Sequence, residues 1–227
     1  AHMLTIHSSI IRHRPIPVLL LLAALLVAGC QPERELAITG RTMGTTYHIK
    51  LIAGLFTSAK PIQKKIDERL GAINRSMSTY DPTSEISRFN AIRTVDEPFS
   101  PSADFLNVLM VAKEIYRLTD GAWDGTLDPL ITLWGFGRKE AASRLPDASE
   151  IEKALAHVGF DRIALDASGH IRKKDPAVTL DLASIAKGYG VDAVSRLLRK
   201  SGFDNFLVEI GGEVYARGHR RDGRAWR

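Results

Sequence analysis

Residues 178–212 read VTLDLASIAKGYGVDAVSRLLRKSGFDNFLVEIGG, and this stretch decides the fold that we expect. Residues 178–182 have the apolar composition of a short buried strand. The amphipathic stretch that follows directly predicts a helix from about 184 to 200, which ends at Gly202. Residues 206–210 are again apolar and predict a second strand. A strand, a helix and a strand in this order indicate that the domain combines both kinds of element.

Earlier parts of the chain show further periodic patterns. Residues 46–51 alternate between polar and apolar side chains, as a half-buried strand does. Pro61 opens a helix whose apolar positions share one face, namely Ile62, Ile66, Leu70 and Ile73. Shorter patterns predict helices at 84–89, at 102–118 and from a capping box at 149–152 to Gly159, and strands at 162–165 and 170–172. Because helices and strands are interspersed with hairpins, we expect an α+β fold with a mixed, largely antiparallel sheet.

The first thirty residues contain the three parts of a secretory signal peptide. Arg12 and Arg14 precede an apolar run at 18–27, which is shorter than the ~20 residues that a spanning helix needs. The run ends in LVAGC at 26–30, which resembles the lipobox of bacterial lipoproteins, where the cysteine is acylated. We therefore expect a lipoprotein signal peptide at 1–30 and a lipid on Cys30, the only cysteine. An uncleaved anchor helix and a buried core helix are the alternatives.

This leader predicts the location of the protein and its surroundings. We expect it on the periplasmic side of a membrane of the bacterial cell envelope, with the inner membrane favoured over the outer one. Residues 31–227 suffice for one core and are expected to form one domain. At 44% hydrophobic and 25% charged residues, the composition is that of an ordinary globular protein. The basic residues from 217 onward predict an exposed hairpin loop, and an exported chain is not expected to bind nucleic acid.

Common catalytic signatures are absent from the sequence. It has no Gly-x-Ser-x-Gly elbow and no Walker loop, and its histidines after the leader lack the spacing of metal ligands. Residues 188–193, GYGVDA, do match the Gly-x-Gly-x-x-Ala form of the dinucleotide fingerprint. The glycines of that fingerprint form the turn directly after a strand, whereas here residues 183–187 intervene. A nicotinamide dehydrogenase is therefore disfavoured, and we expect the two glycines to allow close packing of the helix.

Four other stretches together indicate a pocket for an aromatic ligand that carries phosphate. Met43-Gly44-Thr45 frees the backbone for close approach to a ligand. MSTY at 77–80 adds an aromatic ring and two hydroxyls, and residues 121–137 add a loop rich in aromatic side chains. DLASIAKGY at 181–189 places a carboxylate, a hydroxyl and an ammonium group at the start of a helix, whose free N–H groups suit phosphate.

These blocks, in this order, resemble the FAD:protein FMN transferase family, also called the ApbE family. The resemblance covers residues 40–227 and rests on MGT at 43–45, MSTY at 77–80 with SEISRFN at 84–90, GAWD at 121–124 with WGFG at 134–137, DLASIAKGY at 181–189 and EIGGE at 209–213. It implies an enzyme that binds FAD and Mg²⁺ and attaches the FMN half of FAD to a threonine hydroxyl of an acceptor protein. The link is a phosphoester, and AMP is released. Subunits of membrane redox complexes are the implied acceptors.

The resemblance also implies roles for individual residues. Contacts with FAD are implied for Met43, Tyr80, Ala122, Trp123, Asp124, Asp181 and Lys187. Ser184 is implied as a ligand of Mg²⁺, through its backbone or hydroxyl oxygen, and no catalytic base is identified. The family continues past the Gly-Gly-Glu block and carries acidic metal ligands there, so we expect the domain at 31–227 to be incomplete at its C-terminus. The alternative function is a non-catalytic flavin-binding lipoprotein or an inactive fragment of the transferase.

Overall fold

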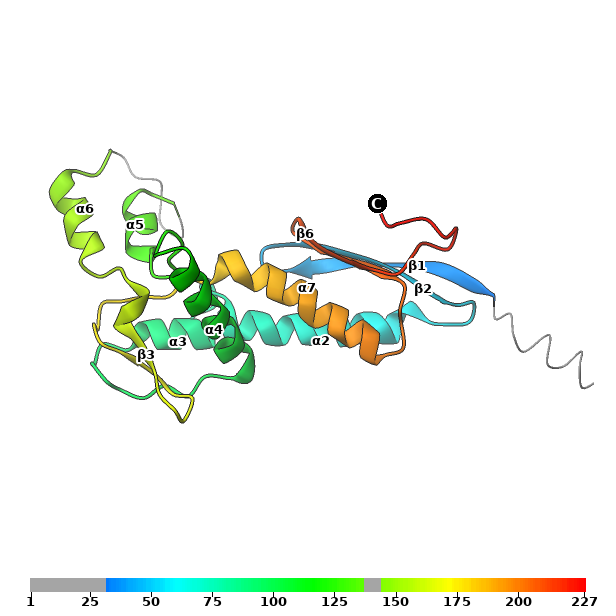
Figure 1. The fold of residues 1–227 in the computed structure, drawn as a ribbon, viewed down its shortest axis with the longest axis horizontal. Helices are drawn as coiled ribbons and strands as arrows, with labels where there is room; N and C mark the ends of the chain where they lie inside the picture. Colours follow the sequence, from blue (N-terminus) through cyan, green and yellow to red (C-terminus); the bar gives the residue numbers. More distant parts are fainter. Residues whose placement is uncertain (1–31, 137–143) are drawn as a thin grey trace, which may run out of the picture.

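The computed structural model describes residues 32–136 and 144–227. The molecule is elongated, with a sheet half at one end and a helical half at the other (Figure 1). The expected signal peptide and Cys30 lie outside the described residues, and so does Gly137. Among the described helices, none is long and apolar enough to cross a membrane.

The sheet half contains four antiparallel strands in the order β1-β2-β5-β6. They span β1 (Glu33–Thr42), β2 (Thr45–Gly54), β5 (Phe206–Ile210) and β6 (Glu213–Arg217). The alternation at 46–51 correctly predicts β2, since Tyr47, Ile49 and Leu51 are buried while the residues between them are exposed. β5 is also confirmed, whereas β1 and β6 were not predicted. An antiparallel sheet with packed helices confirms the expected α+β class.

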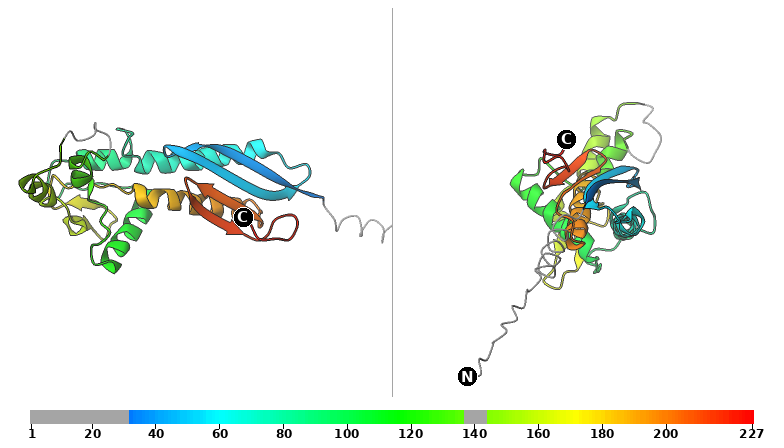
Figure 2. Two further views of the ribbon diagram at one scale, coloured as in Figure 1. Left: turned by 90° about the horizontal axis from the view of Figure 1, so that it is seen from above. Right: turned by 90° about the vertical axis from the view of Figure 1, so that its right-hand side faces the viewer.

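Two long helices, α2 (Ala59–Met77) and α7 (Ala183–Lys200), pack together against one face of this sheet (Figure 1, Figure 2). The helix predicted from Pro61 begins at Ala59, with Pro61 in the first turn, where no intrahelical partner is lost. Its predicted apolar face, from Ile62 to Ile73, is buried. A Cβ on Gly190 would lie 3.3 Å from Met43 Cε, so this glycine does permit close packing, whereas Gly188 faces open space.

The helical half is made of shorter elements around a second core. They are α3 (Glu85–Ala91), α4 (Ala103–Leu118), α5 (Asp128–Leu133), α6 (Ala148–Leu155), the 3₁₀ turn η1 (Phe160–Arg162), β3 (Ile163–Leu165) and β4 (Ile171–Lys173). The predicted α3 and α4 are confirmed within one residue or two at each end. The predicted hairpin is also confirmed, with β3 and β4 paired antiparallel.

Two predictions for this half are wrong. Residues 178–182 form no strand, because both the N–H and the carbonyl of Leu180 bond to the Asn90 side chain, each at 2.8 Å, and Asp181 N–H bonds to Gly125. The capping box lies at Asp147 and Glu150, whose side chains and N–H groups bond reciprocally at 2.9 Å. Asp147 therefore starts the helix two residues before the predicted box, and the helix ends at Leu155.

Candidate functional site

A hollow of about 1010 Å³ opens between the β1–β2 turn, the end of α2 and the start of α7. Its walls are formed by Arg41, Thr42, Met43, Gly44, Thr45, Ile73, Asn74, Met77, Ser78, Thr79, Tyr80, Asp81, Ala183, Ala186 and Lys187. The turn that forms one wall needs positive φ at Met43 (48°) and Gly44 (71°), as a tight hairpin connection does. The volume is at the upper end of the range for pockets that enclose small ligands, about 300–1,000 Å³.

Three of the seven predicted FAD contacts meet in this hollow, namely Met43, Tyr80 and Lys187. Tyr80 is 75% exposed and forms part of the wall of the hollow. Lys187 reaches in from the first turns of α7, and its Nζ lies 3.9 Å from Glu213 Oε1. Met43 contacts both hydrophobic cores, so the turn that carries it is held at the boundary between the two halves.

The start of α7 brings together a second group of predicted residues. Asp181 Oδ1 accepts the N–H of Ala183 at 2.8 Å, which satisfies one of the free donors at the helix start. Ser184 Oγ accepts the indole N–H of Trp123 at 3.2 Å. Trp123, Asp181 and Ser184 therefore surround the helix start beside the hollow, and Ala183 of the same turn forms part of its wall.

Asp124 shapes the loop that carries Ala122 and Trp123. Its Oδ1 accepts both the N–H of Thr126, at 2.8 Å, and the hydroxyl of Thr126, at 2.6 Å. The buried Thr126 hydroxyl oxygen in turn accepts the N–H of Gly159 at 2.7 Å. This chain of bonds fixes the loop against the helical half.

A contact across the sheet orders the Gly211-Gly212 turn beside the hollow. Glu209 Oε1 accepts the N–H of Gly212 at 2.6 Å, and its Oε2 lies 2.7 Å from His48 Nδ1. The bond to His48, and then the bond from Gly212, lower the pKa of the Glu209 carboxyl below its ordinary value. A Cβ on Gly211 would lie only 2.8 Å from Thr45 Cγ2, so this turn approaches the β1–β2 hairpin closely. The block at 209–213 was identified from the sequence, but the contact between His48 and Glu209 was not predicted.

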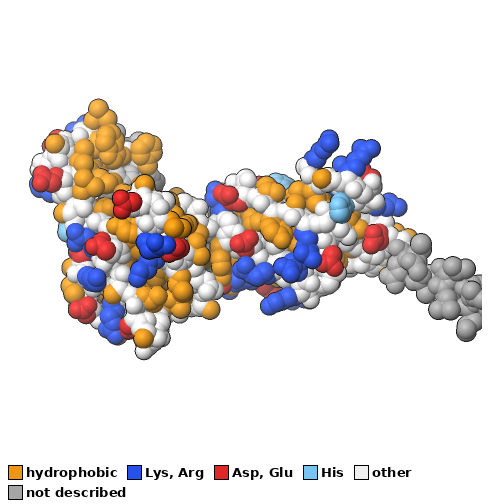
Figure 3. Space-filling model, in the orientation of Figure 1, with side chains coloured by type: hydrophobic (Ala, Val, Ile, Leu, Met, Phe, Trp, Pro, Cys, Tyr) orange, Lys and Arg blue, Asp and Glu red, His pale blue; other side chains and the backbone are white. Residues whose placement is uncertain are grey.

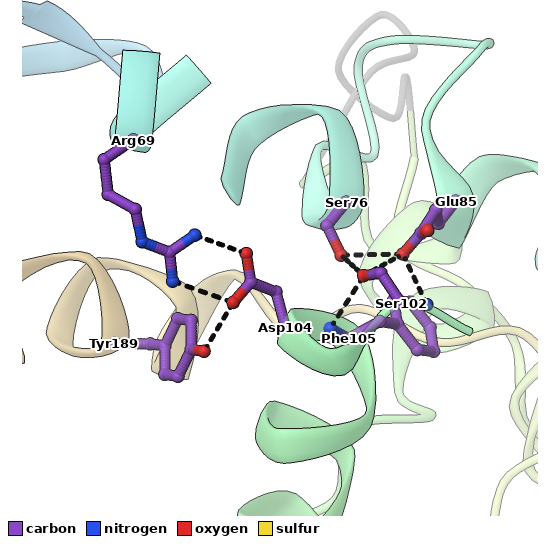
Figure 4. A network of polar contacts seen from close by, with 7 residues as sticks. All are labelled: Arg69, Ser76, Glu85, Ser102, Asp104, Phe105 and Tyr189. Atoms are coloured by element: carbon purple, nitrogen blue, oxygen red, sulfur yellow. Dashed lines mark hydrogen bonds and ion pairs between the residues drawn. The ribbon is translucent and has the colours of Figure 1, made fainter. Parts of the chain in front are cut away.

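Polar contacts join α2, α4 and α7 (Figure 4). Arg69 on α2 donates to both carboxylate oxygens of Asp104 on α4, at 2.5 and 2.7 Å, and Tyr189 on α7 donates to the same carboxylate at 2.7 Å. The guanidinium of Arg69 therefore lowers the pKa of the Asp104 carboxyl. Glu85, at the start of α3, accepts from the hydroxyls of Ser76 and Ser102. Four helices are thus fixed relative to one another. The sequence motifs gave no sign of Arg69 or Asp104.

The model of the ApbE family matches residues 43–227, which is most of the chain. This chain belongs to the ApbE family. Among its relatives, a Vibrio cholerae protein named FAD:protein FMN transferase is 42% identical over 211 residues, covering 91% of this chain and 62% of the relative. A Haemophilus influenzae protein of the same name is 39% identical over 209 residues, covering 89% and 60%.

Solved structures of ApbE proteins share the fold. The flavin transferase ApbE from Vibrio cholerae superposes with a TM-score of 0.82 at 40% identity, covering 86% of this chain and 63% of that one. The flavinyl transferase ApbE from Pseudomonas stutzeri gives 0.80 at 35% identity, with 86% and 64% covered. The chain therefore spans about three fifths of the length of the curated relatives it matches. The resemblance inferred from the sequence motifs is confirmed at the level of the family.

The ApbE membership does not by itself place a metal ion in the described part of the chain. Within residues 32–136 and 144–227, no group of three or more His, Cys, Asp or Glu side chains is arranged to hold a metal. Ser184 offers a hydroxyl and a backbone oxygen, which is too few for magnesium unless a ligand supplies the others. The assignments of Ser184 and of the seven FAD contacts stay predictions.

Proposed function

We propose that this chain carries the flavin site of an FAD:protein FMN transferase. The observation that carries the proposal is the hollow in which the β1–β2 turn, the Tyr80 loop and Lys187 meet beside the start of α7. The names of the relatives supply the reaction class. Met43, Tyr80 and Lys187, which come from three of the quoted blocks, line this one hollow.

Each part of the site has a physical role in this proposal. The exposed ring of Tyr80 offers a face on which a flat ring system can stack. The ammonium of Lys187 and the positive end of the α7 helix dipole both favour a diphosphate. Trp123 holds Ser184 in the first turn of that helix, so the hydroxyl faces a fixed direction. Binding and orientation of FAD are therefore assigned to these residues.

The proposed reaction transfers the FMN moiety to a threonine of an acceptor protein. The threonine oxygen forms a new bond to the phosphorus of the FMN half while the bond from that phosphorus to the bridging oxygen breaks. AMP leaves with the bridging oxygen, and the hydroxyl proton passes to a base that we do not assign. Magnesium, when bound, would supply positive charge beside the diphosphate. Because the described residues offer only Ser184 for it, we derive no step through the metal.

We further propose that acylation of Cys30 holds the protein on the periplasmic side of a bacterial membrane, inner rather than outer. The LVAGC sequence at the end of a short apolar run supports this part. Acceptors that belong to membrane redox complexes would then be reached on the same surface.

The test mixes the purified chain with FAD, Mg²⁺ and an acceptor protein that carries the threonine, and records the mass of the acceptor. A gain equal to FMN that disappears with EDTA is expected. Lys187→Ala should weaken FAD binding by about 10- to 100-fold, as expected when a charge-assisted contact is lost. Lys200→Ala, at the exposed end of the same helix, is the matched control and should bind FAD normally. FAD binding with no change in acceptor mass would favour the non-catalytic flavin-binding alternative, and no FAD binding would refute both.

A further inference from the structure

The end of the sheet half farthest from the helical half exposes two large apolar side chains. Leu55 and Phe56, in the loop between β2 and α2, are 44% and 94% exposed. Single exposed apolar residues are common on soluble proteins, so exposure alone indicates nothing. The position of this loop relative to Pro32 is more informative.

The β2–α2 loop is bonded to the first described residues. Leu55 N–H donates to the carbonyl of Pro32 at 2.8 Å, and Arg34 Nη2 donates to the carbonyl of Thr57 at 2.8 Å. Pro32 follows Cys30 by two residues. Two extended residues span at most about 7 Å. A lipid on Cys30 therefore places the Leu55–Phe56 loop at the membrane surface.

The same end of the molecule carries a basic loop. Residues 219–227 contain four arginines and one aspartate. His219, Arg220 and Arg221 line a hollow together with Glu33 and Ile52, at the start of β1 and the end of β2. Figures 1 and 2 show this loop, the start of β1 and the β2–α2 loop at one end, and Figure 3 shows Lys and Arg side chains projecting there.

The charge at this end is predominantly positive, although carboxylates are present. Glu33 shares the hollow with the arginines, and Asp222 lies 3.8 Å from Arg224. Arg221 is exposed, and Lys60, in the first turn of α2, adds a further exposed cation next to Phe56. An exposed aromatic ring and clustered arginines at the same end of a molecule are the combination that binds the interface of an anionic bilayer.

We propose that this end, formed by Leu55, Phe56 and the basic loop 219–224, docks on a bilayer that contains anionic phospholipids. Phe56 enters the headgroup region, and Arg220 and Arg221 contact the lipid phosphates. The proposal rests on the anchor at Cys30 and goes beyond it. The anchor fixes one point of the chain, whereas the docked end also fixes the orientation of the domain.

The test uses chains recovered from the membranes of expressing cells and reconstituted into vesicles of phosphatidylcholine, with or without phosphatidylglycerol. Phe56→Cys carries an environment-sensitive dye, and Leu155→Cys on α6, at the opposite end, is the control. The unsubstituted chain, labelled in parallel, accounts for any dye on Cys30. We expect the dye at 56 to shift to the blue and to be quenched by lipids with spin labels on their acyl chains, and the dye at 155 to show neither effect.

A second arm tests the charge. Arg220→Glu together with Arg221→Glu should reduce the quenching of the dye at 56 in vesicles with phosphatidylglycerol and leave it unchanged in phosphatidylcholine alone. Lys113→Glu with Lys153→Glu changes the charge equally at exposed sites of the helical half and should have no effect.

Each remaining outcome counts against the proposal. Aqueous emission from the dye at 56, equal to that at 155, would overturn it. If the quenching of the dye at 56 is the same with and without the two Arg→Glu substitutions, the role of anionic lipid is overturned. A shift that occurs only when membrane proteins are included would assign this end to a protein partner instead. Because no arm contains FAD, failure here is distinguishable from failure of the transferase proposal.

Discussion

The two halves of the molecule are stabilised in different ways. In the sheet half, long elements bury apolar side chains in alternating rows, such as Ile49 and Leu51 on β2 against Ile66 on α2. In the helical half, short elements are held by side chains that bond to backbone groups of distant segments. Asn90 bonds to both polar backbone groups of Leu180, and Lys173 donates to the carbonyls of Asn90 and Ile92 at 3.2 and 3.0 Å.

This difference indicates which contacts control the geometry of the proposed flavin site. Apolar packing is tolerant of small shifts, whereas hydrogen bonds fix a segment at one position. The residues before α7 have no strand partner and depend on Asn90 and Gly125. We therefore expect substitutions of apolar core side chains in the sheet half to lower stability alone, and substitutions of the polar contacts that hold the segment before α7 to lower FAD affinity as well.

The largest expected effect is a loss of stability without a loss of binding. Ile66→Ala leaves a cavity in the sheet half and should lower the free energy of unfolding by about 2–5 kcal/mol. Urea unfolding measures it, and titration with FAD under folding conditions should give an unchanged dissociation constant. Lys65→Ala, on the exposed face of the same helix, should change neither quantity. A large fall in FAD affinity in Ile66→Ala would break the distinction between the halves.

The next prediction concerns Asn90. Asn90→Ala leaves the buried N–H and carbonyl of Leu180 unpaired, which should cost about 1–3 kcal/mol. The segment that carries Asp181 loses its fixed position, so FAD binding should weaken beyond what the unfolded fraction explains. Asn90→Asp keeps the acceptor for Leu180 N–H. Its stability and its FAD affinity should therefore lie between those of the unsubstituted chain and those of Asn90→Ala. If Asn90→Ala lowers stability and leaves the affinity of the folded protein unchanged, the bond is structural only.

The third prediction concerns pH. Burial, and then the charge of Arg93, lower the pKa of Lys173 from 10.5 to about 8. The folded state therefore loses this proton at a lower pH than the unfolded state, so stability should rise between about pH 8 and pH 10.5. Lys173→Met should flatten this rise.

Urea unfolding at several pH values measures this slope. Lys174, next to Lys173, is exposed, so Lys174→Met is the control. It should keep the rise of stability with pH that the unsubstituted chain shows. Equal slopes in both variants would show that the buried ammonium does not set the pH dependence of the helical half.

The smallest effect is expected at the surface of the sheet half. Glu209→Gln weakens the contact with His48 and should lower stability by at most about 1 kcal/mol, since the pair is partly exposed. The lowered pKa of Glu209 implies that its contribution is present above the ordinary pKa of 4.5 and is lost as the pH falls below it. Thermal unfolding at pH 7 and pH 4 compares the two chains. If Glu209→Gln lost more stability than Asn90→Ala, the polar contact of the sheet half would matter more than that of the helical half, contrary to this prediction.

Helical periodicity and strand alternation predicted elements of both halves, and each half also contains elements that these patterns missed. The face of α2 from Ile62 to Ile73 follows from helical periodicity alone. β1 was missed because charged residues fill its exposed positions and only Leu36 and Ile38 are buried. Residues 178–182 do alternate as a strand does, with Val178, Leu180 and Leu182 buried. Their backbone bonds go to Asn90 and Gly125, which no local pattern can indicate.

The candidate site shows the same limit. The motifs placed Met43, Tyr80 and Lys187 together through the resemblance to a family, and the structure brings these three to one hollow. The contact of His48 with Glu209 depends on the register of β2 against β5, which joins residues far apart in the chain. Periodicity gives the faces of elements but not the register between them.

The β1–β2 hairpin has one further consequence. Each of its strands has ten residues, and the hairpin runs from the Leu55–Phe56 end to the turn that lines the hollow. At about 3.3 Å per residue, the hairpin is roughly 30 Å long. With its end on a bilayer and its axis upright, the protein would hold the flavin at that height above the lipid. Only an acceptor whose threonine lies at the same distance from the membrane surface would then reach the site.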